Sequence, residues 1–374
     1  MKLFMMFCAV LISFPVLAAT DNGSIKIDGV LAEEFVANKN MKSEKDKPMP
    51  KNIKDHWSGL PILGKQARER GIEIEPPFVV AYHFEHQSQY VRPKQGSLRY
   101  VDIETDIGKT WGESIGLGDE LKGWINIDTL ADGRPNIYIE TGKAKERTIT
   151  SGLRAGVWVF PFMQVYGIYN EIRGKSTVHA RSYTKLSGLM SNVLTQGLID
   201  SIMPGAIYHG NGLVETNDKI EILLDSKNFG GGVTLAGGYK KFFTVLDMNY
   251  TYTKFDFSND YTHTFVISPR VGYDMKLFDR PLRIWTGFMG QYVSSKVTGR
   301  LTALHFDGST GSMVPLINPN GTAGFEVRQK LVRPINYIIG GRYTITPHVA
   351  FMIEGGYAGS GGRKSVLSNI EFIF

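Results

Sequence analysis

The last ten residues, Ser365 to Phe374 (SVLSNIEFIF), alternate between two kinds of side chain. The apolar face carries Val366, Ile370, Phe372 and Phe374, and the mixed face carries Leu367, Asn369, Glu371 and Ile373. A strand with one apolar and one partly polar face fits a closed sheet between lipid and a lumen, where neighbouring strands satisfy every backbone group. This stretch therefore predicts the final strand of a membrane barrel.

The same residues resemble the end of bacterial outer-membrane β-barrel proteins, whose last strand typically ends in Phe after apolar residues at alternating positions. The resemblance implies that Phe372 and Phe374 act as a C-terminal assembly signal for the outer-membrane assembly machinery. It also implies a bacterial outer membrane, with outer-membrane lipids and lipopolysaccharide as neighbours. Because the resemblance is to an architectural class, it implies no particular activity.

The N-terminus predicts export. Lys2 precedes an uncharged apolar run over residues 3–17, and Ala18 and Ala19 offer a signal-peptidase site. This pattern indicates a cleaved secretory signal. The only cysteine, Cys8, lies inside it, so we expect a mature chain without a disulfide or a reactive thiol.

Composition restricts the class of protein. The 374 residues include 42 glycines, 11% aromatic and 42% hydrophobic residues, which is too apolar for a disordered chain and too evenly mixed for a helical membrane protein. The formal net charge of +6 is a mild bias that scattered surface lysines explain. We expect no nucleic-acid partner, no cofactor and no metal.

Three regions follow. Residues 1–19 are the signal peptide, residues 20–75 are a flexible periplasmic segment, and residues 76–374 are the barrel. The lysine- and proline-rich run over residues 42–55 cannot bury a core. The apolar residues that end the segment either dock on the barrel rim or in its lumen, or belong to a loosely ordered linker: Trp57, Leu60, Ile62 and Leu63.

Ten stretches from residue 78 onward have the twofold period of strands. They cover residues 78–85, 153–160, 163–172, 233–239, 242–254, 263–275, 282–293, 336–345, 349–357 and 366–374. If both termini are periplasmic, the short joints face the periplasm and the long connections face outward, which is the usual barrel pattern. Strand-like segments over residues 98–142 make twelve strands equally permissible. The fold class is therefore all-β, an antiparallel transmembrane β-barrel of 10–12 strands with long external loops.

Charged residues on the inward face are the candidates for a lumen constriction: Arg154, Asp247, Arg270, Asp274, Arg283, Arg342 and Glu354. Folding the strands into hairpins places Asp247 opposite Arg270 and Asp274 opposite Arg283. Two interpretations stay open, because paired charges either fill a narrow barrel or form an eyelet that selects solutes.

Residues 186–203 have the apolar spacing of a helix that ends at Pro204. Three placements compete: against the barrel mouth, inside the lumen, or on the membrane surface. The loop-helix candidates are Leu189, Val193, Ile199 and Ile202. A basic cluster precedes them and could contact lipopolysaccharide phosphates: Arg173, Lys175, His179, Arg181 and Lys185.

Recognised enzyme motifs are absent from the sequence. Three histidine pairs are weak candidates for a rim hydrolase: His83 with Glu85, His209 with Asn211, and His263 with Ser268. The sequence thus favours a passive or gated channel for small solutes. A closed structural or surface-interaction barrel and an outer-membrane hydrolase are the alternatives, and the oligomeric state is open.

Overall fold

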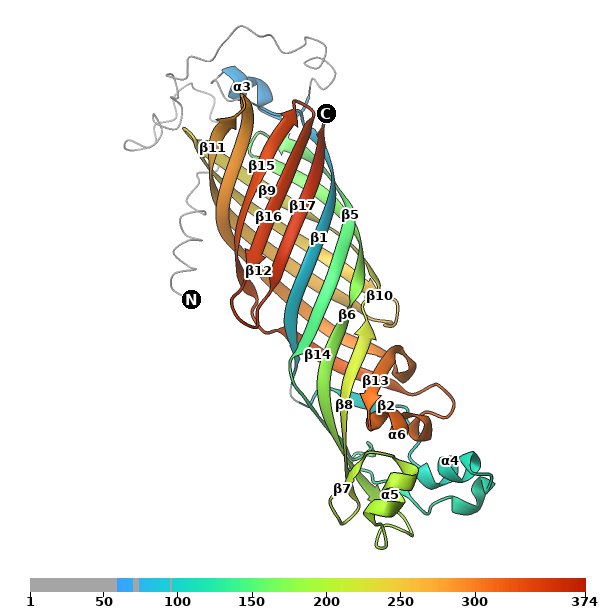
Figure 1. Cartoon of the computed structure of the whole chain (residues 1–374). Coiled ribbons are helices and arrows are strands. Elements are labelled where there is room, and N and C mark those ends of the chain that lie inside the picture. The colour runs from blue at the N-terminus through green and yellow to red at the C-terminus, as the bar shows by residue number, and fades with distance from the viewer. Residues whose placement is uncertain (1–58, 70–73, 95) are drawn as a thin grey trace. The chain divides into compact units, whose positions relative to one another are not determined.

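The computed structural model describes residues 59–69, 74–94 and 96–374 (Figure 1). The signal peptide expected at residues 1–19, the polar run over residues 42–55 and Trp57 lie outside the described residues.

Ten strands close a barrel within the described part of the chain, each antiparallel to the next, and the last one pairs with the first. All ten strands expected from the sequence are members of this ring. In order around the wall they are β1 (Phe78–Pro93), β5 (Ala144–Phe160), β6 (Met163–Ser187), β9 (Ser226–Tyr239), β10 (Phe242–Phe255), β11 (Tyr261–Leu277), β12 (Arg280–Arg300), β15 (Ile335–Thr346), β16 (Val349–Tyr357) and β17 (Lys364–Ile373).

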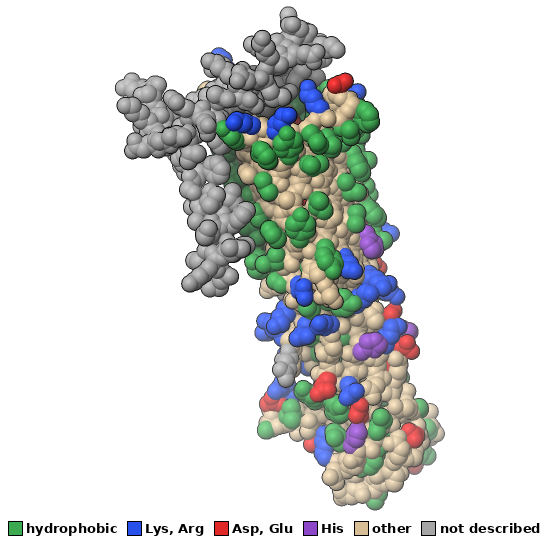
Figure 2. Space-filling view, turned by 60° about the vertical axis from the view of Figure 1, so that its left-hand side comes forward, with side chains coloured by type: hydrophobic (Ala, Val, Ile, Leu, Met, Phe, Trp, Pro, Cys, Tyr) green, Lys and Arg blue, Asp and Glu red, His purple; other side chains and the backbone are tan. Residues whose placement is uncertain are grey.

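The barrel wall has the two faces that the sequence predicts. In β10, Asp247 and Thr251 are buried, whereas Tyr250 between them is exposed. In β17, Ile370 and Phe372 point outward, and the strand closes the ring against β1. The outward side chains form an apolar belt around the barrel (Figure 2), which includes Tyr82, Phe84, Leu153, Tyr169, Ile284, Phe288, Ile339, Ile353 and Ile370. An apolar belt on a closed sheet is the surface that spans a lipid bilayer.

The two ends of the barrel differ. At one end, here named the turn end, β9–β10 and β11–β12 are joined by two-residue turns, and the chain reaches its C-terminus. Phe278 and Asp279 both have positive φ (51° and 59°), as the two central residues of a type I′ turn require. The opposite end, here named the loop end, carries all the long connections, as the sequence predicts (Figure 1).

Several wall strands continue far past the apolar belt at the loop end. β6 has 25 residues and β12 has 21, although a tilted strand needs about 9–11 residues to cross a bilayer. Shorter elements pair with or pack on these extensions and form a folded cap. They are β2 (Arg99–Val101), α4 (Ile107–Ser114), η2 (Gly118–Leu121), β3 (Asn126–Ile127), β4 (Ile137–Thr141), α5 (Gln196–Ile202), β7 (Ile207–Tyr208), β8 (Leu213–Leu223), η3 (Leu301–Ala303), β13 (Leu304–Gly308), α6 (Thr310–Ile317) and β14 (Gly324–Leu331).

The cap has a hydrophobic core of its own. Ile107 of α4, Ile199 of α5, and Met313 and Ile317 of α6 are fully buried in it. The Asp106 side chain caps α4, since it accepts a hydrogen bond from the backbone N–H of Lys109 at 2.9 Å. The cap is therefore a packed unit rather than a set of mobile loops.

The structure decides one open alternative and corrects one expectation. The strand-like segments over residues 98–142 do not add a pair to the ring, since β2, β3 and β4 pair with β14 and β6 inside the cap. The expected helix over residues 186–203 is confined to α5, because residues up to Ser187 continue β6 and the chain then turns. The apolar residues at the end of β6 and those of α5 follow each other closely in the sequence. Together they imitate the spacing of one longer helix.

Near the turn end, α3 (Gly64–Glu69) belongs to the segment that precedes β1. The backbone N–H of Ile62 donates to the carbonyl of Val159 in β5 at 2.8 Å. Ile62 and Leu63 themselves stay exposed. This stretch is thus attached to the barrel rim mainly through its backbone and, as shown below, through Glu75.

Candidate functional site

The lumen of the barrel holds layers of ion pairs. Near mid-height, Arg154 of β5 meets Asp247 of β10 at 3.5 Å. Asp247 also accepts the hydroxyls of Thr234 at 2.6 Å and Tyr166 at 3.0 Å. Arg154 stacks over the Tyr166 ring and donates to Gln164 at 3.1 Å. β6 and β9 lie between β5 and β10 in the wall. The pair therefore spans the lumen instead of joining neighbouring strands.

A second pair crosses the lumen from another part of the wall. Arg270 of β11 binds Glu354 of β16 through two contacts, Nε to Oε2 at 2.8 Å and Nη2 to Oε1 at 3.1 Å. The indole N–H of Trp285 donates to Glu354 at 2.7 Å. The Glu354 side chain is only 3% exposed and that of Arg270 only 15%. Bidentate arginine–carboxylate geometry makes this the best-formed charge pair of the lumen.

The turn end of the lumen contains a network that reaches outside the strands. Arg342 of β15 binds Glu371 of β17 at 2.7 Å, and Arg283 of β12 binds Asp274 of β11 at 3.0 Å. Glu75, from the segment before β1, contacts both arginines at 3.1 and 3.2 Å. The N-terminal segment thereby places a carboxylate between two cations of the wall.

At the loop end of the lumen, Arg363 folds inward from the connection between β16 and β17. Its guanidinium binds Glu85 of β1 at 2.6 Å and Gln291 of β12 at 2.7 Å. The Arg363 side chain is buried. Polar and charged groups therefore lie at several levels of the lumen, and they contact one another there.

The structure places all seven lumen candidates in these ion pairs: Arg154, Asp247, Arg270, Asp274, Arg283, Arg342 and Glu354. The expected pairing of Asp274 with Arg283 is confirmed, since the two residues are also direct cross-strand partners. The expected pairing of Asp247 with Arg270 is wrong. The β10–β11 register places Asp247 opposite Ser268, and Arg270 reaches across to Glu354 instead.

Sequence reasoning missed several lumen residues. Glu75 precedes the first strand and Arg363 lies in a connection, so neither belongs to a periodic stretch. Tyr166 and Trp285 were recognised only as strand residues, although both donate to lumen carboxylates. The sequence could have indicated a lumen position for Tyr166 and Trp285, because each lies on the inward face of its strand.

The loop-helix candidates do not reach the lumen. Ile199 and Ile202 are buried in the cap core, whereas Leu189 is 79% and Val193 is 57% exposed. Figure 1 shows α5 at the far end of the cap from the barrel. None of the three placements expected for this helix is therefore observed.

The structure separates two of the three histidine pairs. His263 contacts the Tyr250 hydroxyl at 3.1 Å, while Ser268 is buried on the opposite face of β11. His209 binds Glu215 in the cap at 2.8 Å instead of Asn211. In the part of the chain that the structure describes, no group of three or more His, Cys, Asp or Glu side chains could hold a metal ion.

No helix among the described residues has the length and apolarity needed to cross a membrane. No protein-family model and no curated protein matches the sequence.

Solved structures of similar shape include the translocator domain of the autotransporter NalP from Neisseria meningitidis, with 9% identity, 83% of this chain and 93% of that chain covered, and a TM-score of 0.31. The COG4313 outer membrane channel from Pseudomonas putida F1 has 8% identity, coverage of 80% and 96%, and a TM-score of 0.29. The toluene transporter TbuX from Ralstonia pickettii has 8% identity, coverage of 80% and 90%, and a TM-score of 0.29. Scores this low carry no argument about what this chain does. Its class, a transmembrane β-barrel with a folded cap, rests on its own closed ring and apolar belt.

Proposed function

We propose that the protein is a bacterial outer-membrane barrel that provides a gated route for small polar solutes, and that its crossing ion pairs are the gate. The turn end and both termini would face the periplasm, and the cap would face outward. Supporting this orientation, the turns at one end are short and the connections at the other are long, as is usual for outer-membrane barrels.

The observation that carries the proposal is the composition of the barrier. The side chains that cross the lumen are charged, Arg154 with Asp247 and Arg270 with Glu354, rather than apolar. A buried ion pair is weak evidence for stability, because apolar residues of similar volume often stabilise a fold equally well or better. Paired charges can, however, separate and become hydrated, which an apolar filling cannot do. Such a lumen can open without exposing apolar surface to water.

Glu75 supplies a second element of the gate. It binds Arg283 and Arg342 at the turn end, and it belongs to the segment that precedes β1 and is not one of the wall strands. Movement of this segment would remove one carboxylate from the network and leave Arg342 with Glu371 and Arg283 with Asp274 as their remaining partners. The N-terminal segment would thereby control the periplasmic mouth.

Solute flux tests this proposal. Liposomes that contain the refolded mature protein should swell slowly in small neutral sugars, and swelling should accelerate in the variant Arg154→Ala/Asp247→Ala, which removes one crossing pair without leaving an unpaired charge. The variant Asp132→Ala/Arg134→Ala removes an exposed ion pair of the cap and serves as the control. Equal, slow swelling of all three proteins would contradict a gate at mid-height.

A second candidate is a closed barrel that anchors the cap as a binding module. The separate hydrophobic core of the cap favours it, because α4, α5 and α6 form a packed unit that needs no contribution from the lumen. Impermeability of both wild type and lumen variants would support this candidate.

A further inference from the structure

The outer wall carries basic residues that the lumen does not use. Arg147 of β5 is the direct cross-strand partner of Lys175 in β6. Lys227 of β9 is likewise the partner of Lys254 in β10. Each of these side chains lies on the same face as the exposed apolar residues of its strand, such as Ile149 in β5, Tyr169 in β6, Phe229 in β9 and Tyr252 in β10.

The pattern repeats on the other side of the barrel. Lys296 of β12 is paired with Arg328 of β14, and Arg92 of β1 is paired with Lys330 of β14. All four side chains are exposed. The four cross-strand pairs together are here named the basic ring. Figure 2 shows lysine and arginine side chains gathered in a band between the apolar belt and the cap.

Like charges directly opposite one another destabilise a sheet. Two members of the ring have carboxylate partners, Lys175 with Glu221 at 3.5 Å and Lys296 with Glu326 at 3.6 Å. The other six form no ion pair with the described residues. Glu171 of β6 is also the cross-strand partner of Lys227. Even with these carboxylates the ring keeps an excess of positive charge, which anions outside the chain would neutralise.

The level of the ring identifies the anion. Aromatic residues border it on the side of the belt, and aromatic girdles mark the boundary of the bilayer in such barrels. Lys254 Nζ, a member of the ring, lies 5.0 Å from the centroid of the Tyr261 ring. The basic ring is thus at the height of lipid headgroups, where phosphates are the available anions.

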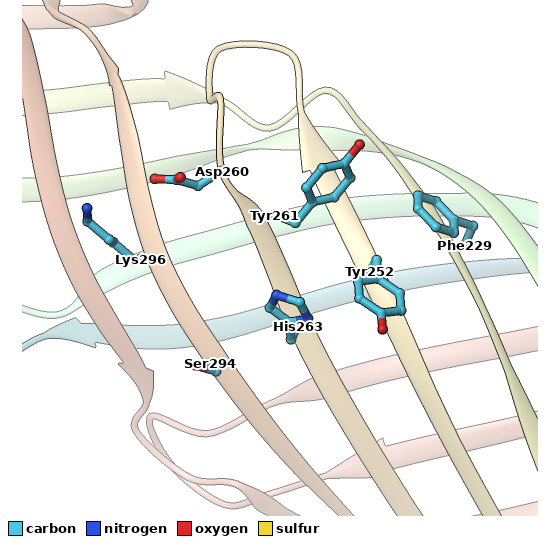
Figure 3. Close-up of a pocket in the computed structure, with 7 residues that line it drawn as sticks. All are labelled: Phe229, Tyr252, Asp260, Tyr261, His263, Ser294 and Lys296. Carbon is cyan, nitrogen blue, oxygen red and sulfur yellow. The ribbon is translucent and has the colours of Figure 1, made fainter.

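The wall is also hollowed beside the ring (Figure 3). A pocket of about 580 Å³ combines aromatic and charged side chains, namely Phe229, Tyr252, Asp260, Tyr261, His263, Ser294 and Lys296. Asp260 accepts the Thr298 hydroxyl at 2.8 Å, so its carboxylate has a partner within the wall. Aromatic rings suit acyl chains, and Lys296 at the side of the pocket suits a phosphate.

We propose that the basic ring binds the phosphate groups of a phosphorylated glycolipid in the outer leaflet, with its acyl chains against the aromatic residues of the wall. This inference rests on the outer-membrane placement proposed above but not on the channel. Contacts between phosphate and lysine or arginine are charge-assisted and remove the repulsion between the paired cations.

Native mass spectrometry and melting curves with two probes test this proposal: lipid A carrying both phosphates, and lipid A with both removed. Wild type should prefer the phosphorylated form. The variant Lys227→Gln/Lys254→Gln/Lys296→Gln/Arg328→Gln should lose at least about tenfold in binding, because each basic residue near an anionic surface contributes roughly a factor of five. The control Lys240→Gln/Lys241→Gln/Lys276→Gln/Arg280→Gln removes four positive charges at the turn end and should bind as wild type does.

A melting measurement without lipid separates lipid binding by the basic ring from a contribution of the ring to barrel stability. In nonionic detergent without lipid A, the ring variant should melt at the same temperature as wild type or higher, because repulsion is relieved. If the fourfold variant does not refold, Lys227→Gln/Lys254→Gln is measured in its place.

Three outcomes would overturn the proposal: equal binding of both lipids by wild type, equal loss in the control, or a melting shift by inorganic phosphate as large as that by lipid A. Channel conductance is recorded on the same samples, so failure of lipid binding is distinguishable from failure of the proposed function.

Discussion

Arg270 and Glu354 lie on strands that are separated by two others in the wall, yet they form a bidentate ion pair through the middle of the barrel. The pair spans the lumen between two strands that are not neighbours, and Trp285 binds the carboxylate from a third strand, β12. The same relationship recurs between Arg154 and Asp247. A ten-stranded barrel is narrow enough for single side chains to span it, since about eight strands leave an interior that side chains just fill.

Removing one partner of the Arg270–Glu354 pair should destabilise the barrel strongly. In Glu354→Ala, the Arg270 guanidinium and the Trp285 indole N–H both lose their acceptor, and leaving a buried charge unpaired costs about 3–5 kcal/mol. Urea unfolding followed by tryptophan fluorescence measures the change. Arg270→Ala/Glu354→Ala should be less destabilised than the single variant, and a double variant that is worse than the single one would disprove this explanation.

Neutralising Glu75 should loosen the turn end. In Glu75→Gln, the ion pairs with Arg283 and Arg342 are lost, so the segment before β1 should exchange backbone deuterium faster. We expect an increase of about fivefold, which corresponds to roughly 1 kcal/mol for a partly exposed pair. The control Glu113→Gln changes an exposed cap residue of the same type. Unchanged exchange of the Ile74 and Glu75 amides, which precede two prolines, would show that Glu75 does not hold the segment.

Acid should loosen the cap before the barrel wall. The hydrogen bond from His209 holds the pKa of Glu215 below its ordinary value, with Asn217 and Arg181 contributing and burial opposing. A carboxyl with a lowered pKa in the folded state stabilises that state above its ordinary pKa, and the contribution disappears as the pH falls through the lowered value.

Hydrogen exchange of β7 and β8 should therefore rise in acid in wild type, in a pH range below the ordinary carboxyl pKa. The rise should be smaller in Glu215→Gln, which lacks the titrating group, and Glu120→Gln should behave as wild type does. Identical acid profiles in wild type and Glu215→Gln would exclude this residue as the cause.

A substitution of Phe374 separates a role in assembly from a role in the stability of the barrel. The Phe374 side chain is 52% exposed on the outer wall, while its backbone exchanges two hydrogen bonds with Phe78. Phe374→Ala keeps these backbone bonds, so refolding in detergent should be almost unchanged. Insertion in cells should fall several-fold if the residue is an assembly signal. Equal loss in both settings would mean that Phe374 serves the barrel wall alone.

The sequence predicts the barrel well because its information is local. All ten ring strands carry a twofold period, and a slip of one residue in β10 would put Asp247 into lipid, so the faces are fixed strand by strand. The cap was not foreseen, because β6 continues from the wall into the cap without a break in its pattern. Its core joins α4, α5 and α6, which are far apart in the chain.

The sequence predicts which charged residues face the lumen, but it does not predict which of them form ion pairs. The inward positions of Arg270 and Glu354 follow from alternation alone. Their contact depends on the number of strands and their tilt around the ring, which a single hairpin does not contain. Glu75 lies outside any strand, and only the closed barrel explains why a carboxylate there meets two arginines.

Single-channel recording of the refolded mature protein in a planar bilayer tests the central claim most directly, with Arg270→Ala/Glu354→Ala measured beside wild type and Asp132→Ala/Arg134→Ala as the control. We predict rare, brief openings for wild type and for the control, and frequent discrete steps for the lumen variant, because the pair that crosses the barrel is gone. Absence of current steps in the correctly folded lumen variant would contradict a gated route. It would favour the second candidate, a closed barrel that anchors the cap as a binding module.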